Sequence, residues 1–340
     1  MSVKLRRINE QVIVITGATS GIGLSTARMA AERGARLVLA ARADDALEEL
    51  ADELHARGTD VVTVTADVGN IDDVERIGAA AIKHFGRIDT WVNNAGISIF
   101  GRLEDVAPED HHRLFQTNFW GVVNGSLEAV KRMKKSGGGA LINLGSELSD
   151  HAIPLQGMYA ASKHAVKGFT DSLRIELEKE GAPLSVTLVK PAGIDTMFAV
   201  HAKNYMDREP KLPAPVYAPE LVADAILHAA QHPKRDIFVG GAARMNSSGS
   251  RLLPRVFDKY AQATMFKNQK MDYATDPSRR DALHKPDHTR ELRERQGSPH
   301  RVHERSPYTA ASLRSQPITT ALLGGGALLA ALALSRRLAR

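Results

Sequence analysis

The chain has 340 residues, of which 43% are hydrophobic and 25% are charged, and it contains no cysteine. This composition is typical of a globular protein with a sizeable core, and it excludes disulfide frameworks, thiolate catalysis and cysteine-ligated zinc. The formal net charge is +6, but arginine and lysine crowd the region after Arg244. The basic character therefore belongs to the C-terminal part, and no nucleic-acid partner is expected.

From Gln11 to about Gly240, short runs of Val, Ile and Leu alternate with longer stretches of helical periodicity. The continuity of the apolar runs indicates strands that are covered on both faces. This alternation predicts an α/β fold with a Rossmann-type doubly wound parallel sheet. Strands are predicted at 12–16, 36–41, 61–66, 88–92, 140–144, 184–190 and 236–239. Helices are predicted at 22–33, 44–57, 71–85, 108–135, 157–180 and 219–232.

A glycine-rich turn, TGATSGIG at residues 16–23, follows the first predicted strand and leads directly into a helix. Its glycines allow a sharp turn and a close approach of the backbone to a ligand, while the helix N-terminus offers free N–H groups and a partial positive charge. Strand, spacing and helix together predict a binding site for the pyrophosphate of a dinucleotide. The expected contacts are Gly17, Thr19, Ser20, Gly21, Ile22 and Gly23.

The end of the second strand bears on which dinucleotide is bound. An acidic residue there would bind the ribose 2′-hydroxyl and repel a 2′-phosphate. This chain has Ala41 followed by Arg42, whose planar guanidinium suits a phosphate. The alternatives are that Arg42 is a solvated strand-end residue, and that Asp44 and Asp45 soften the preference. The sequence thus predicts NADP(H) and leaves NAD(H) open.

Four polar residues form a candidate catalytic set: Asn118, Ser146, Tyr159 and Lys163. Tyr159 and Lys163 are four residues apart, so they share one face of a helix. A cation about 4 Å from the phenol, at an effective dielectric near 20, would lower the phenol pKa by about 3 units before desolvation opposes the effect. Tyr159 could then exchange a proton with a carbonyl or alcohol, and Ser146 could donate a hydrogen bond to the same oxygen.

Together these motifs resemble the short-chain dehydrogenase/reductase family, in its short single-domain branch. Besides the glycine turn, the family's Asp-Val pair matches 67–68, its Asn-Asn-Ala-Gly sequence matches 93–96, and its Asn-Ser-Tyr-Lys tetrad falls on the four residues above. The resemblance covers roughly residues 8 to 240. The sequence departs from the family at 191–193, where Pro-Ala-Gly replaces Pro-Gly, although Thr196 stays in register.

The resemblance implies hydride transfer between nicotinamide and a ketone or secondary alcohol. Tyr159 would be the general acid or base, Lys163 would also contact the nicotinamide ribose, and Asn118 would support a water-mediated proton relay. The resemblance also implies a homodimer or homotetramer. The remaining expected cofactor contacts are Asp67, Val68, Asn94, Ala95, Gly96, Ile194 and Thr196.

Three segments lie outside the regular pattern. The loop at 197–216 lacks strand or helix periodicity and is expected to cover the substrate. After a catalytic domain at 8–245, residues 246–317 predict a basic, mostly disordered linker with one short helix near 252–265. Residues 318–334 carry no charge and would extend roughly 25 Å as a helix.

We expect residues 318–334 to anchor the catalytic domain to a membrane on its cytoplasmic side, where NADP(H) is found. The alternative is a disordered end rich in alanine and glycine. Membrane attachment would favour a hydrophobic substrate.

Two other functions fit the same fold. A non-catalytic dinucleotide sensor or scaffold would be marked by the loss of Tyr159, Lys163 or Ser146, and all three are present. An epimerase or dehydratase of the longer branch would need a folded substrate domain after Gly240, which the composition does not support. His228 and His232 have the spacing of a zinc pair but no evident third ligand, so no metal site is expected.

Overall fold

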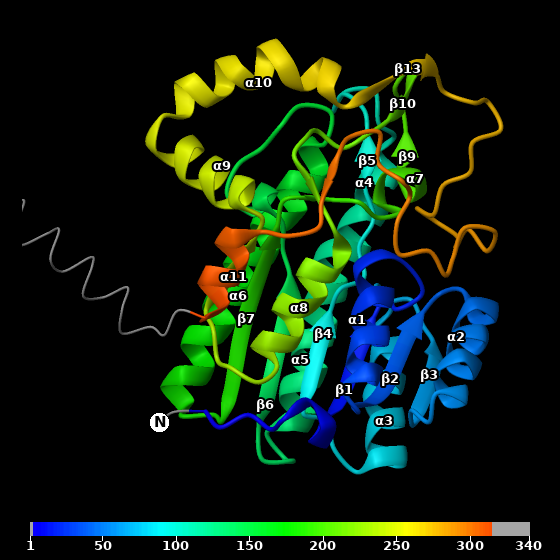
Figure 1. Ribbon diagram of the computed structural model, residues 1–340, viewed down its shortest axis with the longest axis vertical. Coiled ribbons are helices and arrows are strands. Elements are labelled where there is room, and N and C mark those ends of the chain that lie inside the picture. The colour runs from blue at the N-terminus through cyan, green and yellow to red at the C-terminus, as the bar shows by residue number, and fades with distance from the viewer. Residues whose placement is uncertain (1–2, 315–340) are drawn as a thin grey trace, which may run out of the picture.

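The computed structural model describes residues 3–314 of the chain. Its centre is a seven-stranded sheet with helices on both faces (Figure 1). The strand order is β12-β7-β6-β4-β1-β2-β3, and all neighbouring strands are parallel. The predicted doubly wound parallel sheet is therefore confirmed. Its strands are β1 (Val12–Thr16), β2 (Arg36–Ala41), β3 (Val61–Thr65), β4 (Thr90–Asn93), β6 (Gly139–Leu144), β7 (Leu184–Pro191) and β12 (Asp236–Val239).

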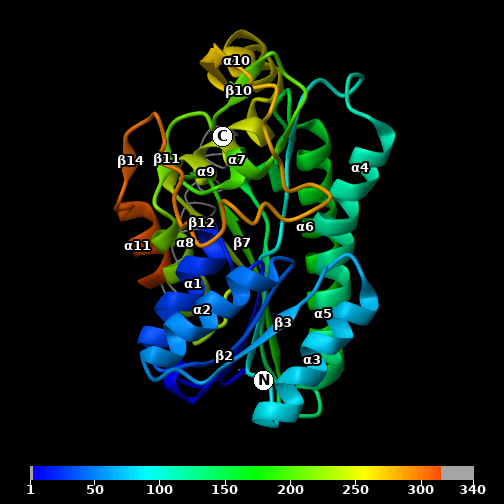
Figure 2. The same cartoon turned by 90° about the vertical axis from the view of Figure 1, so that its right-hand side faces the viewer.

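Two groups of helices cover the two faces of the sheet (Figure 2). Strand β1 is buried on both faces, which explains its run of apolar residues. Ile13 and Ile15 pack in one hydrophobic cluster, and Val12 and Val14 pack in the other. The first face is covered by α1 (Gly21–Glu32), α2 (Asp44–Ala56) and α8 (Pro219–Ala229). The second is covered by α3 (Ile71–Phe85), α5 (Gly121–Met133) and α6 (Gly157–Glu180).

The strand order changes direction between β1 and β4. From β1 the chain continues through β2 to β3 on one side, and from β4 it continues through β6 and β7 to β12 on the other. The carboxyl ends of β1 and β4 therefore flank a crevice, the usual ligand site of a doubly wound sheet. The glycine turn and residues 94–96 follow these two strands.

The single helix predicted at 108–135 is interrupted. It consists of α4 (Pro108–Phe115), a π-helical turn (Gln116–Trp120) and α5. A π turn accommodates one extra residue without changing the helix direction much, so apolar periodicity cannot reveal it. Asn118 is fully buried within this turn.

The segment at 197–216, predicted to be without regular structure, contains short elements that tie it to the rest of the domain. Strand β9 pairs with β5, β10 pairs with β13, and β11 pairs with β8 and β14. The elements of this segment are α7 (Phe198–His201), β9 (Lys203–Asn204), β10 (Arg208–Pro210) and β11 (Val216–Tyr217), and their partners include β5 (Ile99–Phe100) and β8 (Gly193–Ile194).

Residues 246–314, which belong to the predicted linker at 246–317, form helices, short strands and connecting loops in the structure. The short helix predicted near 252–265 corresponds to α10, but the segment also forms other elements, and the predicted boundary at 245 falls inside a helix. Its charged side chains pair with the preceding domain, as Arg295 does with Glu220 at 2.7 Å, so its polar composition does not prevent ordering. The elements are α9 (Gly241–Leu252), α10 (Pro254–Asn268), β13 (Lys270–Ala274), β14 (Val302–His303) and α11 (Pro307–Arg314).

The apolar run at 318–334, with its expected membrane helix, lies outside the described residues. Within residues 3–314, no helix combines the length and apolar character needed to cross a membrane.

Candidate active site

The glycine turn is fixed against the segment that follows β4. The Thr16 hydroxyl oxygen accepts hydrogen bonds from the backbone N–H groups of Asn94 at 3.1 Å and Ala95 at 3.2 Å. The Asn94 side-chain amide donates to the carbonyl oxygens of Thr16 and Gly17. Gly17 has φ +65°, and a Cβ atom there would lie 2.8 Å from the Ala95 Cα. Only glycine fits this close approach, as the motif predicted.

Most of the expected cofactor residues line two neighbouring hollows along the crevice. Both hollows share Gly17, Ser20, Ala95 and Gly96. The two exceptions are Gly23, whose Cα faces the Gly17 carbonyl, and Ile194, which lines a different cavity. The first hollow is also lined by Thr19, Arg42, Asp67 and Val68. The second is also lined by Gly21, Ile22, Asn94, Tyr159, Lys163 and Thr196.

The wall of the first hollow carries charged side chains of both signs, Arg42, Asp67 and Glu291. The Arg42 guanidinium lies there and donates to the backbone carbonyl oxygens of Ala282 and Leu283. Asp67 forms an ion pair with Arg113 at 2.6 Å, so its carboxylate is neutralised within the protein. The glycine cradle at one end of the crevice suits the pyrophosphate of a dinucleotide.

Residues 282–295, which we call the strap, cross over this crevice from the C-terminal part of the chain. The Gly21 N–H donates to the Arg293 carbonyl at 2.9 Å, and the Leu292 N–H donates to the Thr19 carbonyl at 2.8 Å. Strap residues Ala282, Pro286 and Glu291 line the first hollow. No sequence pattern indicates the strap, because its partners are about 270 residues away.

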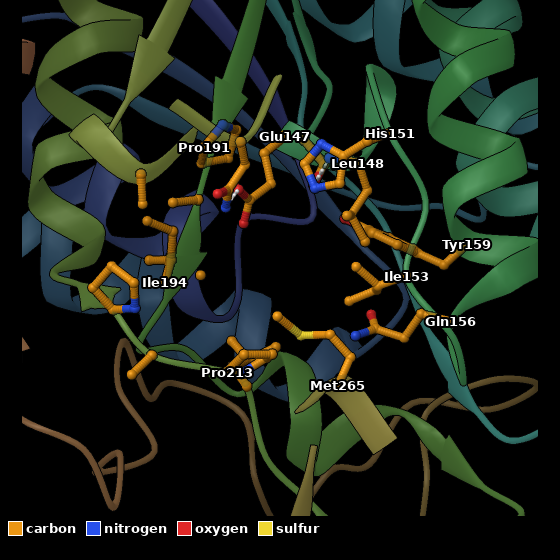
Figure 3. Close-up of a pocket in the computed structure, with 18 of the residues that line it drawn as sticks. Glu147, Leu148, His151, Ile153, Gln156, Tyr159, Pro191, Ile194, Pro213 and Met265 are labelled. Carbon is orange, nitrogen blue, oxygen red and sulfur yellow. Dashed lines mark hydrogen bonds between the residues drawn. The ribbon is translucent and has the colours of Figure 1, made fainter. Parts of the chain in front are cut away.

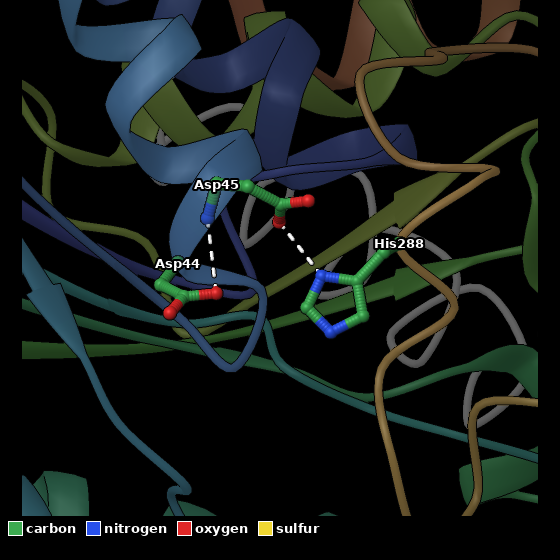
Figure 4. A group of neighbouring side chains, drawn as sticks. All are labelled: Asp44, Asp45 and His288. Carbon is green, nitrogen blue, oxygen red and sulfur yellow. Dashed lines mark hydrogen bonds and ion pairs between the residues drawn. The ribbon is translucent and has the colours of Figure 1, made fainter.

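One exposed contact ties the strap to the start of α2. His288 Nδ1 lies 2.8 Å from an Asp45 carboxylate oxygen, beside Asp44 (Figure 4). The Asp45 contact raises the pKa of His288. The ligand atoms of these three residues are close enough together to hold a metal ion, but all three are exposed, and such acidic groups are common without one. We interpret the pair as a tether.

The predicted catalytic residues lie together where β6 and α6 meet. Ser146 follows β6, and its hydroxyl is hydrogen-bonded to that of Tyr159 from α6. Lys163 Nζ lies 5.7 Å from the centre of the Tyr159 ring and donates to the Leu144 carbonyl at 2.8 Å. The one-face arrangement expected from the spacing of Tyr159 and Lys163 is therefore present.

Burial opposes the predicted lowering of the Tyr159 pKa by Lys163. Burial raises the pKa of Tyr159, and the hydrogen bond from Ser146 lowers it only in part. Burial also lowers the pKa of Lys163, to about 8. For Tyr159, removal of the phenolate from water thus outweighs the hydrogen bond from Ser146. A phenol that keeps its proton at neutral pH is suited to be a proton donor.

Asn118 is held by its neighbours rather than directed at the other three catalytic candidates. Its Oδ1 accepts from the Ile97 N–H, and its Nδ2 donates to the Ile97 carbonyl, both at 2.9 Å. Nδ2 also lies 3.2 Å from the Ser162 hydroxyl, which donates to the Tyr159 carbonyl. Asn118 therefore connects the π turn to the segment after β4 and to the helix that carries Tyr159.

A third cavity, of about 200 Å³, adjoins the second hollow and shares Tyr159, Thr196 and Phe198 with it (Figure 3). Tyr159 lines both this cavity and the second hollow of the crevice. Its walls are mainly apolar, and α9 and α10 complete them with residues such as Met245, Phe257 and Met265. Sequence reasoning missed this contribution of the C-terminal segment. It also missed Glu147, whose only signal was its position directly after Ser146.

Comparisons with known proteins agree with this arrangement. A family model described as short chain dehydrogenase matches residues 11–206. The chain is 47% identical to the uncharacterized oxidoreductase YxnA of Bacillus subtilis over 326 residues, which cover 95% of this chain and 90% of YxnA. It is 34% identical to dehydrogenase/reductase SDR family member 7B of Bos taurus, over 68% of this chain and 73% of that protein.

A solved structure of an alcohol dehydrogenase from Thermococcus sibiricus, complexed with 5-hydroxy-NADP, is 29% identical with a TM-score of 0.59. The match covers 67% of this chain and 95% of that one. The fold is one that binds a nicotinamide cofactor. The resemblance inferred from the motifs is thus confirmed: the chain belongs to the short-chain dehydrogenase/reductase family and is an oxidoreductase that acts on CH–OH groups.

Proposed function

We propose that this protein is an NADP(H)-dependent oxidoreductase that transfers a hydride between nicotinamide and a ketone or secondary alcohol. The observation that carries the proposal is the position of Tyr159, which forms part of both the crevice and the adjoining, mainly apolar cavity. A substrate in the cavity and a nicotinamide in the crevice would meet at this side chain. Its hydroxyl is already paired with Ser146.

The proton chemistry follows from these two hydroxyl groups. When bound, the reduced cofactor supplies the hydride. As negative charge develops on the substrate oxygen, Ser146 stabilises it with a hydrogen bond and Tyr159 donates its proton. The raised pKa of Tyr159 suits this role as an acid, whereas alcohol oxidation requires a positive charge nearby to make the phenolate accessible.

Lys163 and Asn118 support Tyr159 in different ways. The Lys163 ammonium lies close to the phenol ring and lines the crevice, where it can hold a ribose hydroxyl and provide the positive charge. Asn118 fixes the π turn against Ile97, next to the helix of Tyr159. We assign it to the path by which the tyrosine regains its proton through water.

The preference for NADP(H) is supported by Arg42 at the first hollow and by the absence of a carboxylate at position 41. The alcohol dehydrogenase from Thermococcus sibiricus, which is similar to this chain and was solved with an NADP derivative bound, points in the same direction. The mainly apolar cavity supports a hydrophobic substrate.

The test is the oxidation of NADPH, followed by its absorbance, with a panel of ketones of increasing apolar size. Tyr159→Phe should lower kcat by at least about a thousandfold while NADPH still binds, because only the proton donor is removed. Tyr273→Phe is the matched control, since Tyr273 lies exposed on β13. If NADPH binds but no carbonyl is reduced by the unaltered protein, the proposal is wrong and a dinucleotide sensor is favoured.

A further inference from the structure

Glu147 and His151 bring polar groups into an otherwise mainly apolar substrate cavity. Both residues follow Ser146 closely in the chain, and both line the cavity wall. Figure 3 shows their side chains near each other on one side of the cavity, with Ile153, Pro213 and Met265 around the remaining space.

Glu147 has one polar partner from the C-terminal part of the chain. Asn246 Nδ2, from α9, donates to one carboxyl oxygen of Glu147 at 2.8 Å. Among residues 3–314, no ion pair includes Glu147, whereas its neighbour Asp150 is paired with Lys167 and Lys190. Burial raises the pKa of the Glu147 carboxyl to about 7. Its second oxygen thus remains available to a molecule in the cavity.

His151 has unused hydrogen-bonding capacity. Its side chain is only 7% exposed, and within the described part of the chain its Nδ1 has no hydrogen-bond partner. The ring is held edge-on against Phe257 of α10, with 4.8 Å between ring centres. Burial lowers the pKa of His151 to about 4, so the ring is neutral under ordinary conditions. A buried polar atom without a partner is costly, and a ligand group could supply the partner.

We propose that Glu147 and His151 bind a hydroxyl group of the substrate, at a second position from the reacting carbonyl or carbinol, and so select hydroxylated over unsubstituted substrates. This inference rests on the proposed function, because it assumes that the reacting oxygen lies at Tyr159 and Ser146. The substrate class is then an apolar ketone or secondary alcohol that carries one further hydroxyl.

The chemistry of the pair favours a hydroxyl over charged groups. A hydroxyl both donates and accepts, so it can satisfy an imidazole nitrogen and a carboxyl group at the same time. A substrate carboxylate would meet Glu147, and the described residues that line the cavity include no lysine or arginine. A substrate ammonium could pair with Glu147, but it would lose its hydration among apolar side chains such as Ile153 and Met265.

The test compares three ketones with one carbon skeleton that carry a hydrogen, a hydroxyl or a primary amine at the far position. With the unaltered enzyme, kcat/KM for the hydroxyketone should exceed that for the unsubstituted ketone by about tenfold or more. Glu147→Leu should abolish this preference, so that the ratio of kcat/KM for the hydroxyketone to kcat/KM for the unsubstituted ketone falls to about one in this variant. Glu147→Gln keeps a donor and an acceptor at the same place and should retain most of the preference.

His151→Phe provides an independent second variant, since it removes the other partner and keeps a ring against Phe257. It should also reduce the preference. Equal kcat/KM for the hydroxyketone and the unsubstituted ketone in the unaltered enzyme would overturn the proposal. It would also be overturned if Glu147→Leu and His151→Phe lowered kcat/KM for both ketones by the same factor. Preference for the amine would overturn the assignment to a hydroxyl.

A measurement of ketone binding can test the role of Glu147 independently of catalysis. Calorimetric titration of the same ketones into the Tyr159→Phe protein with NADPH measures the preference without turnover. If the Tyr159→Phe protein binds the hydroxyketone more tightly than the unsubstituted ketone, and the double variant with Glu147→Leu does not, the inference is supported even if no carbonyl is reduced. Equal binding overturns it even if reduction is observed.

Discussion

The backbone N–H of Gly21, the first residue of α1, donates a hydrogen bond to the carbonyl oxygen of Arg293. This contact places the strap over the end of the helix where the glycine turn presents its N–H groups. The first hollow remains beneath it, with Ala282, Pro286 and Glu291 as part of its wall. A dinucleotide in the crevice would therefore be partly enclosed by the strap, and its release would require the strap to move.

Loosening the strap should speed the release of the cofactor. Leu283 is fully buried, so Leu283→Ala removes apolar contacts that hold the strap in place. We expect NADPH to dissociate about tenfold faster or more, because a loss of roughly 2 kcal/mol exceeds one factor of ten. Stopped-flow fluorescence measures this rate, with Leu252→Ala as the control because Leu252 is 76% exposed. Faster association with unchanged dissociation would show instead that the strap obstructs binding.

The Arg42 side chain should determine the preference for NADPH over NADH. A charged hydrogen bond is worth about 1.5–3 kcal/mol, so Arg42→Ala should raise KM for NADPH by about 10- to 100-fold. KM for NADH should change by less than about threefold, because NADH lacks the 2′-phosphate. Arg36→Ala is the matched control, as Arg36 lies at the opposite end of β2. An equal rise for both cofactors would mean that Arg42 only supports the fold.

The residues that could be predicted from sequence are those whose spacing is local. Gly17 and Gly21 lie in one turn, and Tyr159 and Lys163 lie one helical turn apart, so pattern alone places each pair correctly. All seven strands of the main sheet are also predictable, because each is a short, mainly apolar and β-branched run between turn signals. Contacts between neighbouring elements then follow from the common topology of parallel sheets.

Contacts over a long separation in sequence were not predictable. The strap meets the glycine turn across about 270 residues, and α10 closes the cavity far from Tyr159. In isolation these segments have the polar composition of a disordered chain. Their order depends on partners such as Glu220 for Arg295. The pKa of Tyr159 was not predictable for a related reason, since spacing shows a nearby ammonium but not the extent of burial.

The rate of ketone reduction should depend on pH through Lys163. Its pKa is lowered to about 8, so its ammonium is present below that pH and is lost above it. The pKa of Tyr159 is raised, so the phenol remains protonated over the same range. We expect kcat/KM for reduction to fall as pH rises through about 8. Glu147, with its pKa of about 7, is the other candidate group, so the fall at about pH 8 should persist in Glu147→Gln. Its disappearance there would contradict the assignment to Lys163.

Asn118 should matter for stability as well as for turnover. Its side chain makes paired hydrogen bonds with the backbone of Ile97 inside the protein, so Asn118→Ala leaves a buried N–H and a buried carbonyl without partners. Because each such group costs about 1–3 kcal/mol, the free energy of unfolding should fall by about 2–6 kcal/mol. Asn124→Ala removes one hydrogen bond, to the Val68 carbonyl at 3.2 Å from a partly buried side chain, and should cost less than about 1.5 kcal/mol. Urea denaturation of both variants measures the difference. Equal losses would mean that Ile97 finds other partners and that the π turn does not depend on Asn118.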